Sequence, residues 1–294
     1  MDSRIDPQTG RPVVAMVYDV DGTLIEGNMQ DGYLRSFGIQ PDDFWQQTNQ
    51  RAQAEDASYI ETYMRMLLEV AKKGRRPLTK SMLIESARHI KLFPGVEEWF
   101  DLFDRLGDEL NITVRHYVIS SGLEEMISGL PIYERFTKVF ASSYRYDAHE
   151  TAIWPRIAID YTGKTQFLFK INKGIHSISD AEKVNEPMEL SERPIPFSRL
   201  IYFGDGATDI PVMRMVKEGG GYSIAVYDST SQNCDQCILK AQRLLKDDRV
   251  QFCYEADYTK GKPLHTTVDT ILRSMRAQLN VEQRIRENHS QMNM

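Results

Sequence analysis

Short apolar runs alternate along this chain with longer segments in which apolar residues recur at helical spacing. The runs are rich in β-branched and aromatic residues, which favour strands. They span residues 13–18, 113–119, 138–141, 199–203, 222–227 and 250–254. Strands separated by helical segments predict an α/β fold with a doubly wound parallel sheet. Such sheets bind ligands beyond the carboxyl ends of their strands, so polar residues at those ends are the first candidates for a functional site.

The long interval between the first two predicted strands indicates a second, smaller domain, because a single crossover helix needs far fewer residues. Helices are expected over 41–54, 57–73 and 79–90, the second ending near Gly74 and the third capped by Thr79. The predicted division is a core of residues 13–26 and 93–277, a helical domain of residues 27–92, and polar termini of residues 1–12 and 278–294.

The helical domain carries an apolar stripe at helical spacing, made of Tyr59, Tyr63, Met66, Leu67 and Val70. A stripe of this width is typical of a helix face that packs inside a domain. We interpret it as the internal core of the helical domain rather than as a surface that contacts substrate.

Two later segments give more local predictions. Residues 152–170 alternate in hydrophobicity around Thr162-Gly163, which predicts a β-hairpin with Lys164 solvated in its turn. Residues 263–277 predict a closing helix, and the polar residues after it are expected to fray.

Two aspartates follow the first strand, in the segment Tyr18-Asp19-Val20-Asp21-Gly22. Alternate residues of an extended chain share a face, so Asp19 and Asp21 point the same way. Two adjacent carboxylates are unfavourable unless a divalent cation neutralises them or one of them stays protonated. Either condition suits phosphoryl chemistry. The alternative is an ordinary strand end followed by an Asp-Gly turn.

Two further predicted strands also end in polar residues. The strand over 199–203 is followed by Gly204-Asp205, and Asp209 comes four residues later, one helical turn away. The strand over 113–119 is followed by Ser120-Ser121-Gly122, where hydroxyls and backbone amides can bind phosphate oxygens. Favourable placement toward a helix dipole would explain the acids alone, and helix capping would explain the serines alone.

These three segments, in this order, resemble the motifs of the haloacid dehalogenase-like hydrolase superfamily. Its first motif, Asp-x-Asp-Gly-Thr-Leu, matches residues 19–24, its second matches Ser120, and its fourth, Gly-Asp-x-x-x-Asp, matches Gly204, Asp205 and Asp209. The resemblance implies a Rossmann-like core, and it makes the helical domain similar to the cap that closes over the active site. Among members, the cap and the loop at Ser120 look nearest to phosphoserine phosphatases.

The family's third motif is a single lysine, for which Lys164, Lys170 and Lys173 compete. We choose Lys173, because Asn172 could cap a helix that begins there, and the family places this lysine near such a helix start. The resemblance then implies that Lys173, Ser120 and Ser121 bind the phosphoryl oxygens.

The resemblance also implies a mechanism. Asp19 would attack phosphorus to give an aspartyl-phosphate, and Asp21 would act as general acid and then as general base. Mg²⁺ would be held by the carboxylates of Asp19 and Asp205 and the backbone carbonyl of Asp21, with Asp209 as a ligand or an orienting group. Members that cleave carbon–halogen bonds lack the second aspartate, so Asp21 favours phosphoester chemistry.

The expected function is therefore Mg²⁺-dependent hydrolysis of a small phosphorylated metabolite. A phosphomutase or phosphotransferase would carry the same motifs. A catalytically silent binding protein would lack a motif acid, whereas all four acids are present here. Glu26, Asn28, Arg35 and Arg65 are candidate specificity residues in the cap.

Composition adds limits on partners and location. The net charge of −6 disfavours nonspecific nucleic-acid binding, and no apolar run reaches membrane-spanning length. The polar start of the chain lacks the apolar region of a secretory signal, which predicts a cytoplasmic protein. Cys234 and Cys237 have metal-site spacing, but no second pair completes a zinc set, so we interpret them as reduced cysteines.

Overall fold

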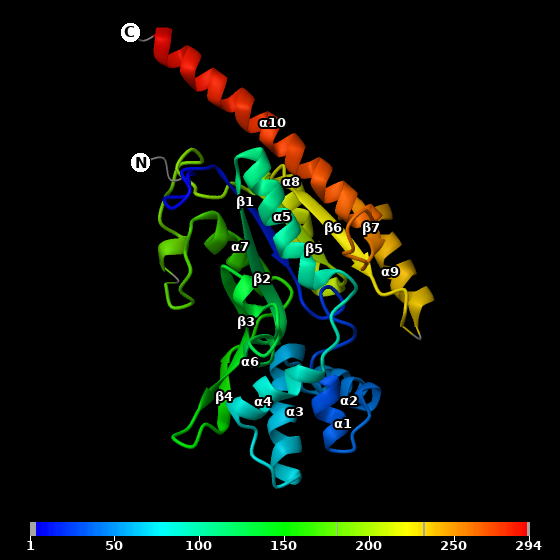
Figure 1. Ribbon diagram of the computed structural model, residues 1–294. Helices are drawn as coiled ribbons and strands as arrows, with labels where there is room; N and C mark the ends of the chain where they lie inside the picture. The colour runs from blue at the N-terminus through cyan, green and yellow to red at the C-terminus, as the bar shows by residue number, and fades with distance from the viewer. Residues whose placement is uncertain (1–3, 181, 232, 293–294) are drawn as a thin grey trace.

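The computed structural model describes residues 4–180, 182–231 and 233–292, and within them seven strands form one sheet of order β4-β3-β2-β1-β5-β6-β7 (Figure 1). The strands are β1 (Val13–Tyr18), β2 (Thr113–Leu123), β3 (Lys138–Tyr146), β4 (Ala152–Ile157), β5 (Leu200–Gly204), β6 (Tyr222–Tyr227) and β7 (Phe252–Glu255). Neighbouring strands are parallel except β3 and β4, which are antiparallel. The predicted doubly wound α/β fold is confirmed.

Helices cover both faces of this sheet and one of its ends (Figure 1). The α-helices are α1 (Asp31–Ser36), α2 (Pro41–Glu55), α3 (Tyr59–Lys73), α4 (Lys80–Ser86), α5 (Val96–Leu110), α6 (Glu124–Ile127), α7 (Gly163–Asn172), α8 (Ile210–Glu218), α9 (Cys234–Lys246) and α10 (Pro263–Met292). Short 3₁₀ turns are η1 (Ala87–His89), η2 (Tyr133–Arg135), η3 (Glu182–Val184), η4 (Phe197–Arg199) and η5 (Ala207–Asp209). No helix in the described part of the chain is long and apolar enough to cross a membrane.

Strand β1 lies at the centre of the sheet and is buried along its whole length. Its alternate residues enter two apolar layers: Val14, Met16 and Tyr18 pack with α5 and α10, while Val13, Ala15 and Val17 pack with α7, α8 and α9. Burial on both faces explains why the strand reads as a continuous apolar run instead of an alternating one.

The chain order reverses between β1 and β5, which places a topological switch point beside the end of β1. Tyr18 pairs with Val118 of β2 on one side and with Phe203 of β5 on the other. The Asp19 amide then donates to the carbonyl oxygen of Phe203 at 2.9 Å. The carboxyl ends of β1, β2 and β5 therefore lie at the same edge of the sheet. Ligands bind at this edge in open α/β sheets.

Helices α1–α4 form the smaller helical unit predicted between the first two strands, and they lie beyond one end of the sheet (Figure 1). The Thr79 side chain accepts from the Met82 amide at the start of α4, and Gly74 ends α3, as the capping signals predicted.

The predicted β-hairpin over 152–170 is wrong. Its first part is β4, which pairs with β3, but its second part is helix α7. The Asp160 carboxylate accepts from the Gly163 amide at 3.1 Å and so caps the start of this helix. Phe167 and Leu168 are buried on one helical face, so the apolar residues follow a helical period.

The closing helix also continues past its predicted end. Helix α10 runs to Met292, although Leu279 is the last of its buried residues. Its later turns are exposed and project from the body of the molecule (Figure 1). Residues 293–294 of the predicted frayed tail lie outside the described residues.

Candidate active site

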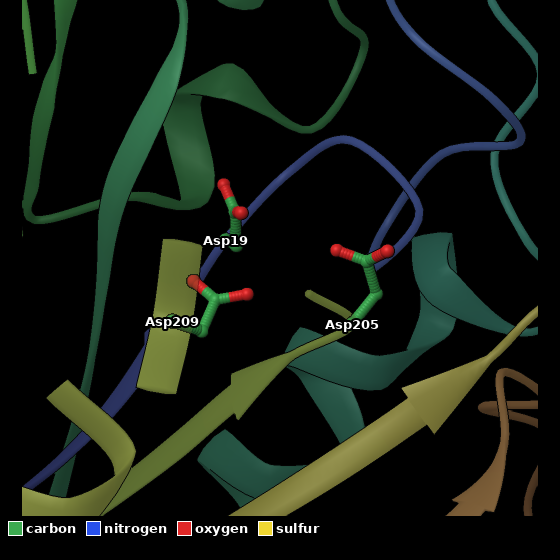
Figure 2. Close-up of side chains that lie close together, drawn as sticks. All are labelled: Asp19, Asp205 and Asp209. Carbon is green, nitrogen blue, oxygen red and sulfur yellow. The ribbon is translucent and has the colours of Figure 1, made fainter. Parts of the chain in front are cut away.

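Three carboxylates from two strand ends converge beyond the sheet (Figure 2). Asp19 follows β1, Asp205 follows β5, and Asp209 closes the turn η5 that leads into α8. Each offers a carboxylate oxygen, and these oxygens all lie within 4.8 Å of one another. Such close carboxylates repel each other unless cations or protons compensate them.

The buried ammonium of Lys164 compensates part of this charge. Its Nζ donates to Asp19 Oδ2 and to Asp209 Oδ1, both at 2.7 Å, and the side chain is fully buried. Burial opposes the charged form of Lys164, but the two carboxylates outweigh it and raise the lysine pKa. Lys164 is therefore a fixed positive charge beside Asp19.

The prediction that Lys173 lies in this cluster is wrong. Lys173 ends α7, and its ammonium donates to the backbone carbonyls of Val184 and Glu186. Lys170 likewise donates to carbonyls, those of Ser177, Ile178 and Asp180. Both lysines tie the following loop to α7, because their helical positions turn them away from Lys164.

A sequence signal for Lys164 did exist. Lys164, Phe167, Leu168 and Ile171 recur at spacings of three, one and three residues, which is one face of a helix, and all four are buried. The strand period predicted for residues 152–170 is therefore wrong, and it is this period that assigns the buried Lys164 to a solvated turn.

The Asp209 carboxylate accepts hydrogen bonds from three protein donors. Besides Lys164, its carboxylate accepts from the Tyr202 hydroxyl at 2.7 Å and from the Gly206 amide at 3.1 Å. The side chain is fully buried. A carboxylate that accepts from three protein donors is well suited to orient Lys164, and about one of its four acceptor sites is left for a metal ion.

Asp21 lies beside the cluster, against the irregular end of β2. Its Oδ1 accepts from the Met29 amide at 2.8 Å. A Cβ atom at Gly122 would approach its Oδ2 to 3.1 Å, so the absence of a side chain there leaves room for the carboxyl group. Burial, followed by the charge of Asp19, raises the pKa of Asp21 well above its usual value. A carboxyl group that keeps its proton at neutral pH can act as an acid.

Nearby positive charges also fail to offset fully the burial of Asp19 and Asp205. Burial raises the pKa of Asp19 to about 7 despite Lys164. Burial also raises the pKa of Asp205, although the Lys240 ammonium, 3.2 Å from Asp205 Oδ2, acts in the opposite direction. Lys240 comes from α9, and no motif or strand end marks it in the sequence.

This donor set fits a divalent cation. Four carboxylates lie here, and among the described residues their ion-pair partners are the two ammonium groups of Lys164 and Lys240. Hard cations such as Mg²⁺ prefer carboxylate oxygens. Because Asp209 is occupied by protein donors, Asp19 and Asp205 are the carboxylates best placed to hold such an ion.

The two serines near the end of β2, where its register with β3 shifts, have different environments. The Ser120 hydroxyl is buried and accepts from the Gly122 amide at 3.0 Å, so it shapes the loop. Ser121 lines the cavity described below, and its buried hydroxyl has no hydrogen-bond partner among the described residues. A buried hydroxyl without a partner is costly, which makes Ser121 the better placed serine to donate to a ligand oxygen.

A cavity of about 550 Å³ opens over the carboxylates, between the sheet and helices α2 and α3. The predicted internal stripe is confirmed, because Tyr63, Met66 and Leu67 are buried in the core and Tyr59 and Val70 pack against it. Tyr59 and Tyr63 line the cavity as well. Of the four candidate specificity residues, Asn28 lines the cavity, whereas the Arg65 guanidinium pairs with Glu55 and Glu69. Glu26 and Arg35 are not among the lining residues.

Comparisons with solved structures support the same fold. A hydrolase of this superfamily from Salmonella enterica subsp. enterica serovar Typhi superimposes with a TM-score of 0.53 at 17% identity, covering 84% of this chain and 69% of that one. A substrate-bound phosphoserine phosphatase gives a TM-score of 0.51 at 14% identity, covering 83% and 93%. At these identities the likeness concerns the fold alone.

Sequence comparisons extend the match. A protein of Borreliella burgdorferi described as uncharacterized is 25% identical over 289 residues, which is 87% of this chain and 95% of the relative. The family model for haloacid dehalogenase-like hydrolases matches residues 16–214, which run from β1 into α8 and include Asp19, Lys164 and Asp209. The chain therefore belongs to the haloacid dehalogenase-like hydrolase family.

Proposed function

We propose that this protein is a Mg²⁺-dependent phosphatase that hydrolyses a small phosphorylated metabolite through an aspartyl-phosphate on Asp19. The observation that carries the proposal is the position of Asp19 at the end of the central strand, with Lys164 on one of its oxygens and Asp21 two residues away. A nucleophile and a proton donor then border one cavity, with a fixed positive charge buried directly behind the nucleophile.

Asp19 is held for attack by contacts at both of its oxygens. Oδ1 accepts from the Val20 amide at 2.7 Å, and Oδ2 accepts from Lys164. The positive charge of Lys164 opposes the effect of burial on the Asp19 pKa and reduces the repulsion between Asp19 and an anionic phosphate. Asp209 and Tyr202 hold Lys164 in place from the other side.

Asp21 supplies the proton that the leaving alcohol needs. Its raised pKa keeps it protonated before attack, and after the alcohol leaves it can accept a proton from the water that hydrolyses the aspartyl-phosphate. The Ser121 hydroxyl would donate to a phosphoryl oxygen. When bound between Asp19 and Asp205, Mg²⁺ would neutralise phosphate charge.

Helices α1–α4, within residues 27–92, would act as the cap. They contribute Trp45, Tyr59 and Tyr63 to the cavity wall, so the cap would enclose the alcohol part of the substrate. A confined site of this size excludes large phosphorylated macromolecules and suits a small metabolite.

The first test is phosphate release from a panel of phosphorylated metabolites and p-nitrophenyl phosphate, with Mg²⁺ or with a chelator. We expect chelation to lower release at least about a hundredfold, because the carboxylates would lose their counter-charge. Mg²⁺ should also stabilise the metal-free protein, by about 2.7 kcal/mol at a hundred times its Kd. Thermal unfolding with and without Mg²⁺ measures this. Equal rates and equal melting temperatures with and without Mg²⁺ would contradict the proposal.

A second prediction concerns Gly22, which has a φ of +64°. A Cβ atom there would lie 2.8 Å from the Asp205 carboxylate, so Gly22→Ala must displace Asp205. We expect phosphate release to fall about a hundredfold, as for a displacement near 1 Å in a catalytic group. Gly38→Ala is the matched control, because Gly38 has a φ of +70° and open space around it. Equal activity of the two variants would contradict the role of Asp205.

A phosphotransferase would use the same residues but pass the phosphoryl group to an alcohol. Adding alcohol acceptors to the assay and analysing the products separates the two reactions, since a phosphatase releases inorganic phosphate whether or not an acceptor is present.

A further inference from the structure

Aromatic rings from two helices and one loop line part of the cavity. Trp45 comes from α2, Tyr59 and Tyr63 come from α3, and Tyr161 comes from the loop before α7. We refer to these four residues as the aromatic wall. The phosphate must lie at Asp19, so the aromatic wall faces the alcohol part of the ester.

The rings of the aromatic wall meet at a steep angle and leave no gap wide enough for another flat ring. The Trp45 and Tyr63 rings are 5.6 Å apart at 70°, so they present faces at a steep angle to each other. The Trp45 and Tyr59 rings are nearly parallel, but their centroids are only 6.3 Å apart. A flat ring between two others needs about 7 Å, two contacts of about 3.5 Å each. A nucleobase therefore cannot insert between Trp45 and Tyr59, whereas a corner of ring faces suits a compact cation.

A buried acceptor without a partner among the described residues also lines the cavity. Gln30 lines the cavity and is only 2% exposed, and its Oε1 has no hydrogen-bond partner among the described residues. Leaving such an oxygen unpaired costs about 1–3 kcal/mol. A ligand that places an N–H donor here would recover that cost.

The charges near the aromatic wall are negative. Among the described residues that line the cavity, Lys240 is the only lysine or arginine, and it is paired with Asp205. Asp31 accepts from the Trp45 indole nitrogen at 3.3 Å, directly behind the wall. Burial raises the pKa of Asp31 although Trp45 and Arg35 act in the opposite direction, so this carboxyl group lacks a full counter-charge.

We infer that the preferred substrate is a phosphate monoester whose alcohol part carries an alkylammonium group and no carboxylate. This inference rests on the proposed phosphatase function and names the substrate class. The ammonium would contact the faces of Trp45 and Tyr63 and donate to Gln30 Oε1. A carboxylate in the same place would be desolvated beside Asp31 without a cationic partner, which is strongly unfavourable.

The test compares esters that differ in one group. Ethanolamine phosphate carries the ammonium, propyl phosphate replaces it with a methyl group, and serine phosphate adds a carboxylate. We expect kcat/KM for ethanolamine phosphate to exceed that for each of the other two at least about tenfold, as cation–π contacts in a desolvated site allow. Equal or lower kcat/KM for ethanolamine phosphate would overturn the inference. Adenosine monophosphate as the best substrate would overturn it in favour of ring stacking.

Trp45→Leu tests the aromatic wall, because leucine is apolar but has no ring face. We expect the ratio of kcat/KM for ethanolamine phosphate over propyl phosphate to fall toward one. Trp154→Leu is the control, since Trp154 lies on β4, is 65% exposed and does not line the cavity. An unchanged ratio in Trp45→Leu would overturn the assigned contact.

Failure of the proposed function gives a different result. If no ester, including p-nitrophenyl phosphate, releases phosphate with Mg²⁺ present, the phosphatase proposal fails. Calorimetry on the unmodified protein with Mg²⁺ present then still tests the preference, because without turnover it measures binding alone. Binding of ethanolamine phosphate about tenfold tighter than that of propyl phosphate would support the inference, and equal binding would overturn it.

Discussion

Replacing Asp19 with asparagine is expected to lower phosphate release by about 10⁴-fold or more while leaving the protein folded. Asparagine keeps the shape of the side chain and an oxygen that can accept from Lys164, but its amide cannot attack phosphorus to form the acyl-phosphate. Removing the nucleophile from an enzyme that uses covalent catalysis costs this much or more. Steady-state phosphate release measures the rate, and circular dichroism verifies the fold.

Asp42→Asn is the control for this change, because Asp42 is exposed at the start of α2 and lies outside the cavity. It should retain full activity. Residual turnover by Asp19→Asn within about tenfold of the unmodified protein would show that Asp19 is not the nucleophile. Hydrolysis would then have to proceed by direct attack of water.

Replacing Lys164 with methionine is expected to affect both stability and catalysis. The change leaves Asp19 and Asp209 buried without their shared cation, and removing one partner of a buried ion pair costs about 3–5 kcal/mol. Denaturant unfolding of the metal-free protein measures this loss. Phosphate release with Mg²⁺ present should fall at least about a hundredfold, because the fixed positive charge beside the nucleophile is gone.

Lys173→Met is the matched control, since Lys173 lies at the end of the same helix but contacts only backbone carbonyls of the following loop. We expect it to lose at most about 1–2 kcal/mol of stability, the worth of charge-assisted hydrogen bonds, and to keep its catalytic rate. If Lys173→Met lost its activity while Lys164→Met stayed active, Lys173 would be the motif lysine, as the sequence predicts.

The strands and their polar ends could be predicted because their signals are local. The residues 13–18 form a strand with those bounds, and the residues 222–227 do as well. Parallel strands bring their carboxyl ends to one edge of a sheet, so Asp19 and Asp205 had to meet once the sheet was predicted. The convergence of three carboxylates was in this sense already present in the sequence.

The environment of those carboxylates could not be predicted from local signals. Lys240 comes from α9, 35 residues after Asp205, and Tyr202 contacts Asp209 only because the chain turns back after β5. Ser120 and Ser121 differ because the Gly122 amide donates to the Ser120 hydroxyl in the folded protein. Each of these contacts is a result of how the elements pack.

By itself, the sequence determined the fold class, the motif acids and the family, because apolar period and strand-end chemistry act over a few residues. The tertiary structure decided which lysine joins the acids and which aromatic residues face the cavity. Lys164, Lys170 and Lys173 are chemically equivalent along the chain, and only the rotation of α7 against the sheet buries Lys164 beside Asp19. Tyr59 and Tyr63 have the spacing of a packed stripe, and only the position of α3 over the site makes them line the cavity as well. A local period can show which face of a helix is buried, but the placement of that helix arises from packing between distant segments.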